Sequence, residues 1–337
     1  LETAADDKTR ATARLRRGLL RYRLGLFAEA LEDFQAVVDA GVGGRDLEQA
    51  FFMRGWCRMM LGQDGEALAL CREFIDRFPD SPWTEDVLFW LGEHHFNRAD
   101  YPAAEERFLQ IADTHPESPL ADDALFWGAR AAFREKEYLR TVEHLNRLAR
   151  DFPDSEKMPE VRFAQGDALS ELGQFPAAIL AFDKVVHEFP ESYLADRAWG
   201  RMGDCHFTLG AENPERYREA AACYEQVLNS ESSPRSLKLQ AETKIGRCRE
   251  KSGDPDAAFE HYMNVVYDHI AARREGLPGD PVWFTRAAFG AAQIAERNNR
   301  WRQAAGIYQR VVDAGVAAAP EAQTRLQKLR LEHWLLF

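Results

Sequence analysis

The chain has 337 residues, of which 45% are hydrophobic and 29% are charged, so it carries enough apolar side chains to form a core. It holds 43 Lys and Arg against 55 Asp and Glu, and the net charge of −12 argues against nucleic acid as a partner, because phosphates would be repelled. No stretch approaches the roughly 18 uninterrupted apolar residues of a membrane-spanning helix. Because the chain begins with Leu1 rather than Met, its ends do not indicate a compartment.

A step of 37 residues recurs along the chain. Four tetrapeptides of the form Phe/His-Pro-Asp/Glu-Ser lie at this spacing, at 78–81, 115–118, 152–155 and 189–192. The same step joins a series of small residues, which are Gly18, Gly55, Gly92, Ala129, Gly166 and Gly203. Self-similarity at a fixed period predicts a row of stacked units rather than two globular domains.

Each copy of the repeat has the pattern of two helices. In most copies another small residue follows the first by 12 positions, and a larger residue comes one helical turn later, as in Ala104 and Phe108. Small residues on consecutive helices let the backbones approach, while the larger residue fills the space beside the crossing. Turn residues lie between the helices, and the proline of each tetrapeptide stops the second one. The pattern therefore predicts one helical hairpin per copy.

In chain order we expect one elongated solenoid of about eight hairpins over residues 1–337, with a final capping helix. A loop at 211–216 is longer than its counterparts, and a longer connection at 271–281 precedes the eighth copy. The predicted hairpins occupy residues 11–44, 48–81, 85–118, 122–155, 159–192, 196–234, 239–272 and 285–318, and the cap occupies 320–335.

These residues resemble the tetratricopeptide repeat (TPR), whose pattern places Trp, Leu-Gly and Tyr on one helix and Ala, Phe and Pro on the next. The third copy matches with Leu88, Leu91, Gly92, His95, Ala104, Phe108 and Pro116. The 37-residue step and the tetrapeptide are similar to a branch of bacterial envelope proteins, the outer-membrane assembly lipoproteins and the periplasmic Tol-Pal coordinator of cell division. The resemblance implies an all-α, right-handed superhelical solenoid that serves as a binding scaffold. It also implies a periplasmic or envelope location, with the cytoplasm as the alternative.

No catalytic or metal-binding motif is evident. His94 and His95 point about 100° apart on a helix, and His261 and His269 are two turns apart, so neither pair suits one metal ion. No Ser, Cys or His lies in a recognisable nucleophile motif. The five cysteines are expected to be small buried side chains, with a Cys57–Cys71 disulfide as the alternative. We expect no enzyme activity, no cofactor and no metal site.

The family register implies where a partner protein would bind. In this register the second, fifth, ninth, twelfth and thirteenth residues of each copy face a concave groove. The fifth residue is Phe in copies two to five, and it either completes the packing between repeats or lines a groove for an extended or helical peptide. Nearby Trp, Met and Arg are typical of binding hot spots. The candidate groove residues are Phe52, Trp56, Met59, Phe89, Glu93, Phe96, Phe126, Arg130, Phe133, Arg134, Phe163 and Asp167.

Two functions follow from these features. The first is a scaffold that binds a peptide segment of another protein, and the alternative is a spacer or self-associating module of a larger protein that meets its copies through the solenoid ends. Arginines on the opening helix are either a solvated end cap or a contact for an acidic partner or an anionic membrane surface. They are Arg10, Arg14, Arg16, Arg17, Arg21 and Arg23.

Overall fold

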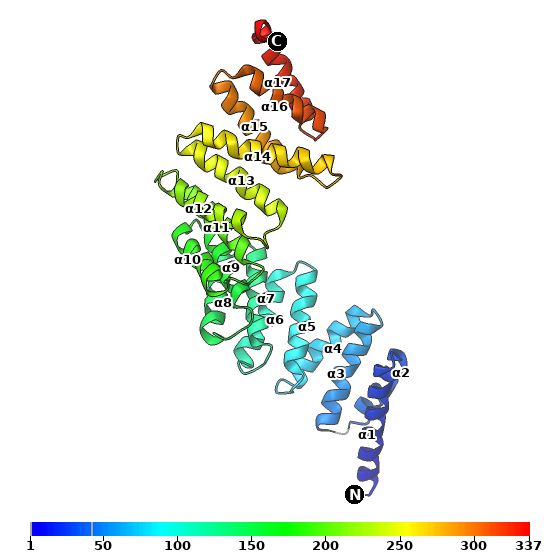
Figure 1. The fold of residues 1–337 in the computed structure, drawn as a ribbon. Coiled ribbons are helices and arrows are strands. Elements are labelled where there is room, and N and C mark those ends of the chain that lie inside the picture. The colour runs from blue at the N-terminus through cyan, green and yellow to red at the C-terminus, as the bar shows by residue number, and fades with distance from the viewer. Residues whose placement is uncertain (1, 42) are drawn as a thin grey trace. The chain divides into compact units, whose positions relative to one another are not determined.

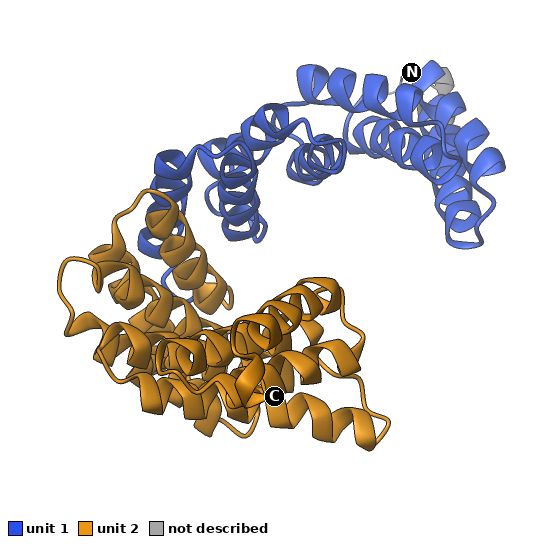
Figure 2. Ribbon diagram, turned by 90° about the horizontal axis from the view of Figure 1, so that it is seen from above, with its two compact units in different colours: residues 1–155 blue, residues 156–337 orange. Residues whose placement is uncertain are grey.

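The computed structural model describes residues 2–41 and 43–337, while Leu1 and Val42, which fall inside the predicted 1–337 solenoid, lie outside the described residues. Every regular element in the described part is a helix, so the all-α prediction is confirmed (Figure 1). The chain divides into two compact units, residues 1–155 and 156–337, shown in blue and orange in Figure 2. Each unit is a row of paired helices, and one continuous solenoid over both stays a prediction.

Unit 1 contains four hairpins and unit 2 contains four hairpins followed by a final helix. The helices of unit 1 are α1 (Glu2–Arg23), α2 (Phe27–Asp39), α3 (Arg45–Met60), α4 (Asp64–Arg77), α5 (Thr84–Asn97), α6 (Tyr101–Thr114), α7 (Ala121–Arg134) and α8 (Tyr138–Asp151). Those of unit 2 are α9 (Met158–Glu171), α10 (Phe175–Glu188), α11 (Ala195–Leu209), α12 (Arg216–Asn229), α13 (Arg235–Lys251), α14 (Pro255–Arg274), α15 (Pro281–Arg297), α16 (Trp301–Ala314) and α17 (Ala319–Glu332), with a short 3₁₀ turn at Trp334–Leu336.

The two helices of most hairpins meet where a glycine faces an aromatic ring. A β-carbon built on Gly92 of α5 would lie 2.6 Å from Cε1 of Phe108 on α6, closer than real β-carbons come to other atoms. Glycine is therefore required at this crossing, and the buried ring fills the space beside it. The same contact recurs in four other hairpins at 2.5–2.7 Å, in the pairs Gly18–Phe34, Gly166–Phe182, Gly203–Tyr224 and Gly246–Tyr262.

The other two copies with a small residue in this series have a smaller partner. In the second hairpin, Cys71 takes the place of the ring, and a β-carbon on Gly55 would lie 3.6 Å from its sulfur, an ordinary contact. In the fourth hairpin the two positions hold Ala129 and Leu145, both fully buried. The eighth hairpin instead combines Ala292 with Tyr308, both fully buried, so a ring on the second helix does not require glycine in every copy.

The turn inside each hairpin also follows the repeat. Five residues at the 37-residue step have a positive φ: Gly25, Gly62, Ala99, Lys136 and Gly173. The left-handed conformation lets two backbone N–H groups after the first helix bond to its last carbonyls, as Gly62 and Gln63 do to Met59 and Arg58. The predicted turns between the helices are confirmed.

Buried charges and the last helix complete the core. On α1, Arg17 and Arg21 both pair with Asp33 of α2, whose exposed fraction is 2%, so these two arginines join the two helices of the first hairpin.

At the C-terminal end of unit 2, α17 buries Leu326 and Leu329 against the last hairpin, as expected of a cap. All five cysteines are buried free thiols, as predicted, and no Cys57–Cys71 disulfide forms.

Candidate functional site

The predicted groove residues lie on α3, α5 and α7 of unit 1 and on α9 of unit 2, which are the first helices of their hairpins. None of the twelve is fully buried. Glu93, Arg130 and Arg134 are exposed, and the others are half-buried. Within each unit, we call the accessible side of its first helices the first-helix face of that unit; these helices are α3, α5 and α7 in unit 1 and α9, α11, α13 and α15 in unit 2.

Two of the four fifth-position phenylalanines, Phe89 and Phe163, pack inside their own hairpins. Phe89 meets Phe108 edge to face, with ring centroids 5.3 Å apart and planes at 69°. Phe163 meets Phe182 in the same way at 5.4 Å and 66°. The partner ring belongs to the second helix of the same hairpin, not to the neighbouring repeat. Each phenylalanine therefore supports its hairpin with one part of the ring and leaves another part accessible.

The second hairpin differs because its second helix has Cys71 in place of the ring. Here Phe52 packs on Trp56 with centroids 4.3 Å apart, and it stacks on Trp83 at 5.9 Å. Trp56 in turn lies 6.4 Å from Trp90 of α5. All four rings are half-buried, so they form an aromatic surface from α3 to α5 within unit 1.

A second aromatic group joins α5 to α7. Phe96 contacts Trp127 edge to face at 5.3 Å, and the guanidinium of Arg130 lies 4.3 Å from the centre of Trp127 and 5.8 Å from that of Phe96. We call Phe96, Trp127 and Arg130 the Phe96 cluster. An exposed cation over two half-buried rings contributes about 0.5–1 kcal/mol and keeps the side chains in one arrangement.

The remaining predicted residues are not brought into this cluster by a ring contact. Phe133 packs on Tyr138 of α8 at 5.3 Å. Although Glu93 as a whole residue is exposed, local desolvation of its carboxyl raises its pKa. Asp167 of α9 accepts a 2.8 Å hydrogen bond from Arg201, yet burial still raises the pKa of Asp167 above its ordinary value.

Sequence reasoning missed Trp83, Trp90 and Trp127. Trp90 and Trp127 are one repeat step apart and both take the sixth position of their copies, next to the expected fifth-position phenylalanines. The recurrence of Trp at a fixed step was the signal available for them. Trp83 lies in the connection before α5, outside the helical register, and had no such signal.

The first-helix face of unit 2 is polar. The hydroxyl of Tyr224 on α12 donates to Oδ1 of Asp204 on α11 at 2.6 Å, and Nζ of Lys244 lies 2.6 Å from the same oxygen. The two following hairpins repeat this tyrosine–carboxylate contact, in the pairs Tyr262–Glu250 at 3.3 Å and Tyr308–Glu296 at 2.6 Å. In these hairpins the ring hydroxyl of the second helix reaches a carboxylate of the first.

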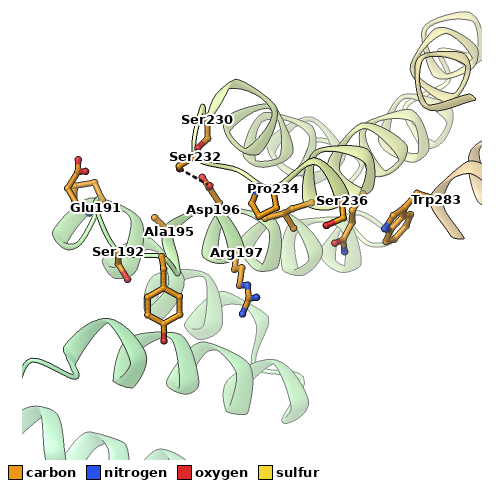
Figure 3. Close-up of a pocket in the computed structure, with 14 residues that line it drawn as sticks. Glu191, Ser192, Ala195, Asp196, Arg197, Ser230, Ser232, Pro234, Ser236 and Trp283 are labelled. Carbon is orange, nitrogen blue, oxygen red and sulfur yellow. Dashed lines mark hydrogen bonds between the residues drawn. The ribbon is translucent and has the colours of Figure 1, made fainter. Parts of the chain in front are cut away.

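Two cavities border this face of unit 2. The larger, about 750 Å³, lies where α11 and α13 begin, and Trp283 closes one side (Figure 3). It lies where the α12–α13 connection lacks the Phe/His-Pro-Asp/Glu-Ser tetrapeptide of earlier connections and has Ser230, Ser232 and Ser233 instead. Ser232 donates to Asp196 at 3.2 Å across its wall. The smaller, about 190 Å³, lies between Asp204, Lys244 and Arg247.

Within residues 2–41 and 43–337, no group of three or more His, Cys, Asp and Glu side chains is arranged to hold a metal ion. The same residues include no helix of the length and apolar character needed to cross a membrane.

Comparisons with known proteins agree with this architecture. Residues 2–44 and 15–82 match the tetratricopeptide repeat model, and residues 87–213 match the model of an outer membrane lipoprotein family. A search of curated proteins finds no significant match. Proteins of the tetratricopeptide repeat class use their extended concave surfaces for binding, and the second model describes a family of outer membrane lipoproteins.

Several solved structures are similar to the chain. A crystal structure of the MamA protein is 16% identical over 60% of this chain and 100% of its own, with a TM-score of 0.49. A tetratricopeptide repeat protein from Parabacteroides merdae ATCC 43184 is 12% identical, covers 83% of this chain and 99% of its own, and has a TM-score of 0.45. From the glycine-to-ring crossings, the repeated turns and the family matches, the chain belongs to the tetratricopeptide repeat proteins, and its residues 87–213 are similar to an outer membrane lipoprotein family.

Proposed function

We propose that the protein is a non-catalytic scaffold that binds a segment of a partner protein through the first-helix face of unit 1, in the periplasm or at the envelope. The observation that carries this proposal is the Phe96 cluster. Its two rings are only half-buried, whereas rings that served the hydrophobic core alone would be fully buried. The guanidinium of Arg130 lies over both rings. Trp, Phe and Arg in such an arrangement are the side chains most enriched at binding hot spots.

The half-buried rings offer a partner a hydrophobic contact. Each patch of about 100 Å² of ring that a partner covers contributes about 2.5 kcal/mol before the cost of association is subtracted, so several side chains of a partner must pack on the rings. Arg130 and Arg134 are exposed beside the rings. A partner segment with apolar side chains and a nearby carboxylate matches both features, in either an extended or a helical conformation.

The direct test is photo-crosslinking in cells from positions 56, 96 and 133, which lie on first helices. Leu139 provides the matched control, because it is 62% exposed on the second helix α8 of the same unit. We expect one protein to be captured from the first-helix positions and not from position 139. Capture from position 139 alone would reject the proposed binding face.

A charge reversal distinguishes specific binding from nonspecific hydrophobic association. Arg130→Glu should strongly reduce capture from position 96, because it places a repelling charge beside the partner's carboxylate. Arg150→Glu is the control, since Arg150 is exposed on α8 and bonds to its neighbour Asp151. Equal capture by both variants would contradict a role for Arg130.

A second candidate function is self-association through the ends of the chain. Several apolar side chains are exposed beyond the buried face of α17, including Leu331 at 77%, Trp334 at 70% and Leu335 at 78%. Trp334→Ser with Leu335→Ser removes two of these apolar side chains without touching the buried residues of α17. Concentration-dependent sedimentation that disappears in the double variant would support self-association, and a monomer at all concentrations would exclude it.

A further inference from the structure

A groove on unit 2 lacks a side chain that the repeat supplies in earlier hairpins. In the second hairpin, Phe78 is the C-cap of α4, and its ring packs on Phe74 of the same helix and on Phe51 of α3. The ring centroids are 5.3 Å and 5.8 Å apart, respectively. The C-caps of the next three second helices are also half-buried rings, at His115, Phe152 and Phe189. A ring at the end of the second helix is thus a regular part of the hairpin.

The sixth hairpin has no such ring. The C-cap of α12 is Ser230, and the side chain of the next residue, Glu231, is exposed. A cavity of about 250 Å³ lies beside Ser230 and is also lined by Trp199 and Asn229. Trp199 has the same place in its repeat as Phe51, four residues before the glycine of the crossing. The cavity therefore lies where the ring of the other hairpins would pack, and we call it the Trp199 slot.

The Trp199 slot is continuous with the larger cavity of about 750 Å³. The two share four wall residues, which are Pro190, Ala195, Asp196 and Ser230. Together they form a groove within unit 2 that leads to Trp283, which lies at one end of the larger cavity in Figure 3. Because this groove crosses the first turns of α11, α13 and α15, it suits an extended chain better than a compact molecule.

The walls of the groove offer both hydrogen-bond donors and acceptors. The side chains of Gln226, Asn229 and Gln240 line it, and none of these three amides has a hydrogen bond to another of the described residues. A side-chain amide both donates and accepts, as does each peptide group of an extended segment. The amides can therefore pair with the backbone of a segment that lies in the groove.

Asp196 places a negative charge at the centre of the groove. Asp196 lines both cavities, and its carboxylate accepts a 3.2 Å hydrogen bond from Ser232 (Figure 3). It forms no ion pair with any residue that the structure describes, and the neighbouring Arg197 lines the larger cavity only. A positively charged side chain beside the Trp199 slot would pair with this carboxylate.

We propose that this groove binds an extended segment of a partner protein, which places an aromatic side chain in the Trp199 slot and a Lys or Arg side chain beside Asp196. The repeat itself shows which group fits, because rings occupy the same place in four other hairpins. The volume of about 250 Å³ is enough for one ring, since a cavity of roughly 150 Å³ takes up benzene. The proposal does not depend on the binding face of unit 1.

The first test uses the full chain and a capped pentapeptide with a central Phe between two Lys residues. The chain is labelled with 5-fluorotryptophan, so that each of its eight Trp residues gives a ¹⁹F signal, and Trp199→Phe assigns the signal of Trp199. We expect the peptide to shift the Trp199 signal. A peptide with Ala in place of the central Phe should leave this signal unchanged at the same concentration.

Filling the Trp199 slot gives a second test, in which a dye-labelled form of the peptide is titrated by fluorescence anisotropy. Ser230→Phe adds a ring at the C-cap and should weaken binding roughly tenfold or more. Ser252→Phe is the matched control, because Ser252 is exposed at the C-terminal end of α13, whereas the groove borders the start of this helix. Asp196→Asn should weaken binding severalfold. Circular dichroism checks that each variant keeps its helices.

Photo-crosslinking in cells identifies the source of the segment. A crosslinker at position 240 should capture a protein other than this chain. Ser230→Phe should abolish this capture, and Ser252→Phe should not. Capture from positions 56 and 96 should be the same in Ser230→Phe as in the native chain, which distinguishes a failure of this groove from a failure of the binding face of unit 1.

Four results would overturn the proposal. The first is that the Trp199 signal does not move at millimolar peptide, and the second is that it moves equally with the Ala peptide. The third is that the affinity is unchanged in Ser230→Phe. The fourth is that position 240 captures a second copy of this chain and that Ser230→Phe lowers the sedimentation coefficient, which would show that the groove joins copies of the chain.

Discussion

The crossing of α9 and α10 allows a quantitative test of the repeat. A β-carbon on Gly166 would lie 2.5 Å from Cε1 of Phe182, and Phe182 is fully buried. Gly166→Ala therefore forces either the ring or the two helix backbones to move. Gly200 lies on α11, the first helix of the next hairpin, and no atom lies within 4 Å of a β-carbon built on it. The same substitution should thus have opposite effects at two glycines of one unit.

The expected magnitudes follow from two competing terms. Forcing an extra carbon into a packed crossing costs about 1–3 kcal/mol, while alanine in a helix interior is favoured over glycine by about 0.5–1 kcal/mol. Gly166→Ala should therefore destabilise its hairpin by roughly 1–2 kcal/mol, whereas Gly200→Ala should stabilise α11 by up to about 1 kcal/mol. Gly55→Ala should also be stabilising or neutral, because the sulfur of Cys71 is at an ordinary distance of 3.6 Å.

Hydrogen exchange with mass spectrometry is the suitable assay, because repeat proteins need not unfold in one step. Peptides from α9 and α10 report the local opening of this hairpin. A loss of 1–2 kcal/mol raises their opening constant about 5–30-fold. The double variant Gly166→Ala with Phe182→Leu reproduces the Ala129–Leu145 pair of the fourth hairpin, and it should recover much of the loss.

The reasoning fails under two results. If Gly166→Ala protects its hairpin as Gly200→Ala protects α11, then the ring does not require the glycine. If Phe182→Leu costs as much in the Gly166→Ala background as in the native chain, then the two residues are not coupled, and the double-mutant cycle gives no interaction energy.

Three further predictions concern other parts of the chain. Burial alone would raise the pKa of Asp33, but Arg17 and Arg21 outweigh it and hold the pKa low. The ion pairs therefore stabilise the fold fully above the pKa that Asp33 has in the unfolded chain, and this stabilisation is lost as the pH falls through the lower pKa of the folded state. Asp33→Asn should cost about 1–3 kcal/mol of unfolding free energy at neutral pH. It should also weaken the fall of the unfolding free energy with decreasing pH. Lys136→Gly should raise stability by about 1 kcal/mol in thermal unfolding, because Lys136 has a φ of 64°. Burial raises the pKa of the thiols at 57, 71, 223 and 248 to about 12, so iodoacetamide should label them only after denaturant is added.

The hairpins could be predicted from the sequence because each depends on local features. Gly92, Ala104 and Phe108 meet inside one hairpin, and turn residues such as Gly173 act through their own backbone angles. The length of α14 could not be predicted in the same way. Glycines and prolines at 276–281 indicate a long connection, which was expected from residue 271 but begins at 275 because α14 extends to Arg274. Residues 271–274 are compatible with either a helix or a loop, and the hydrogen bond from Arg235 to the carbonyl of Pro278 becomes visible only in three dimensions.

The candidate site was predicted less completely, for a physical reason. A family register states which positions face a groove, but it does not state which rings touch each other. Phe96 meets Trp127 of the next hairpin, so its partner depends on how hairpins stack. The sequence predicted that Phe89 either packs between repeats or lines a groove, but its ring meets Phe108 of its own hairpin. Trp127 follows Trp90 by one repeat step of 37 residues, so the sequence could have pointed to it. Its role became clear only from its contacts with Phe96 and Arg130.

One position in the repeat affects both the packing and the chemistry of the first-helix face. The large residue of the second helix is Phe in the third and fifth hairpins, at 108 and 182, and Tyr in the last three, at 224, 262 and 308. A buried phenylalanine makes no demand on the opposite helix beyond a glycine and an apolar neighbour. A buried tyrosine needs a hydrogen-bond partner for its hydroxyl, and Asp204, Glu250 and Glu296 supply it from the first helix. The change from Phe to Tyr in the core therefore requires carboxylates on the first helices of the last three hairpins, whereas the hairpins with Phe leave their first helices free to be aromatic.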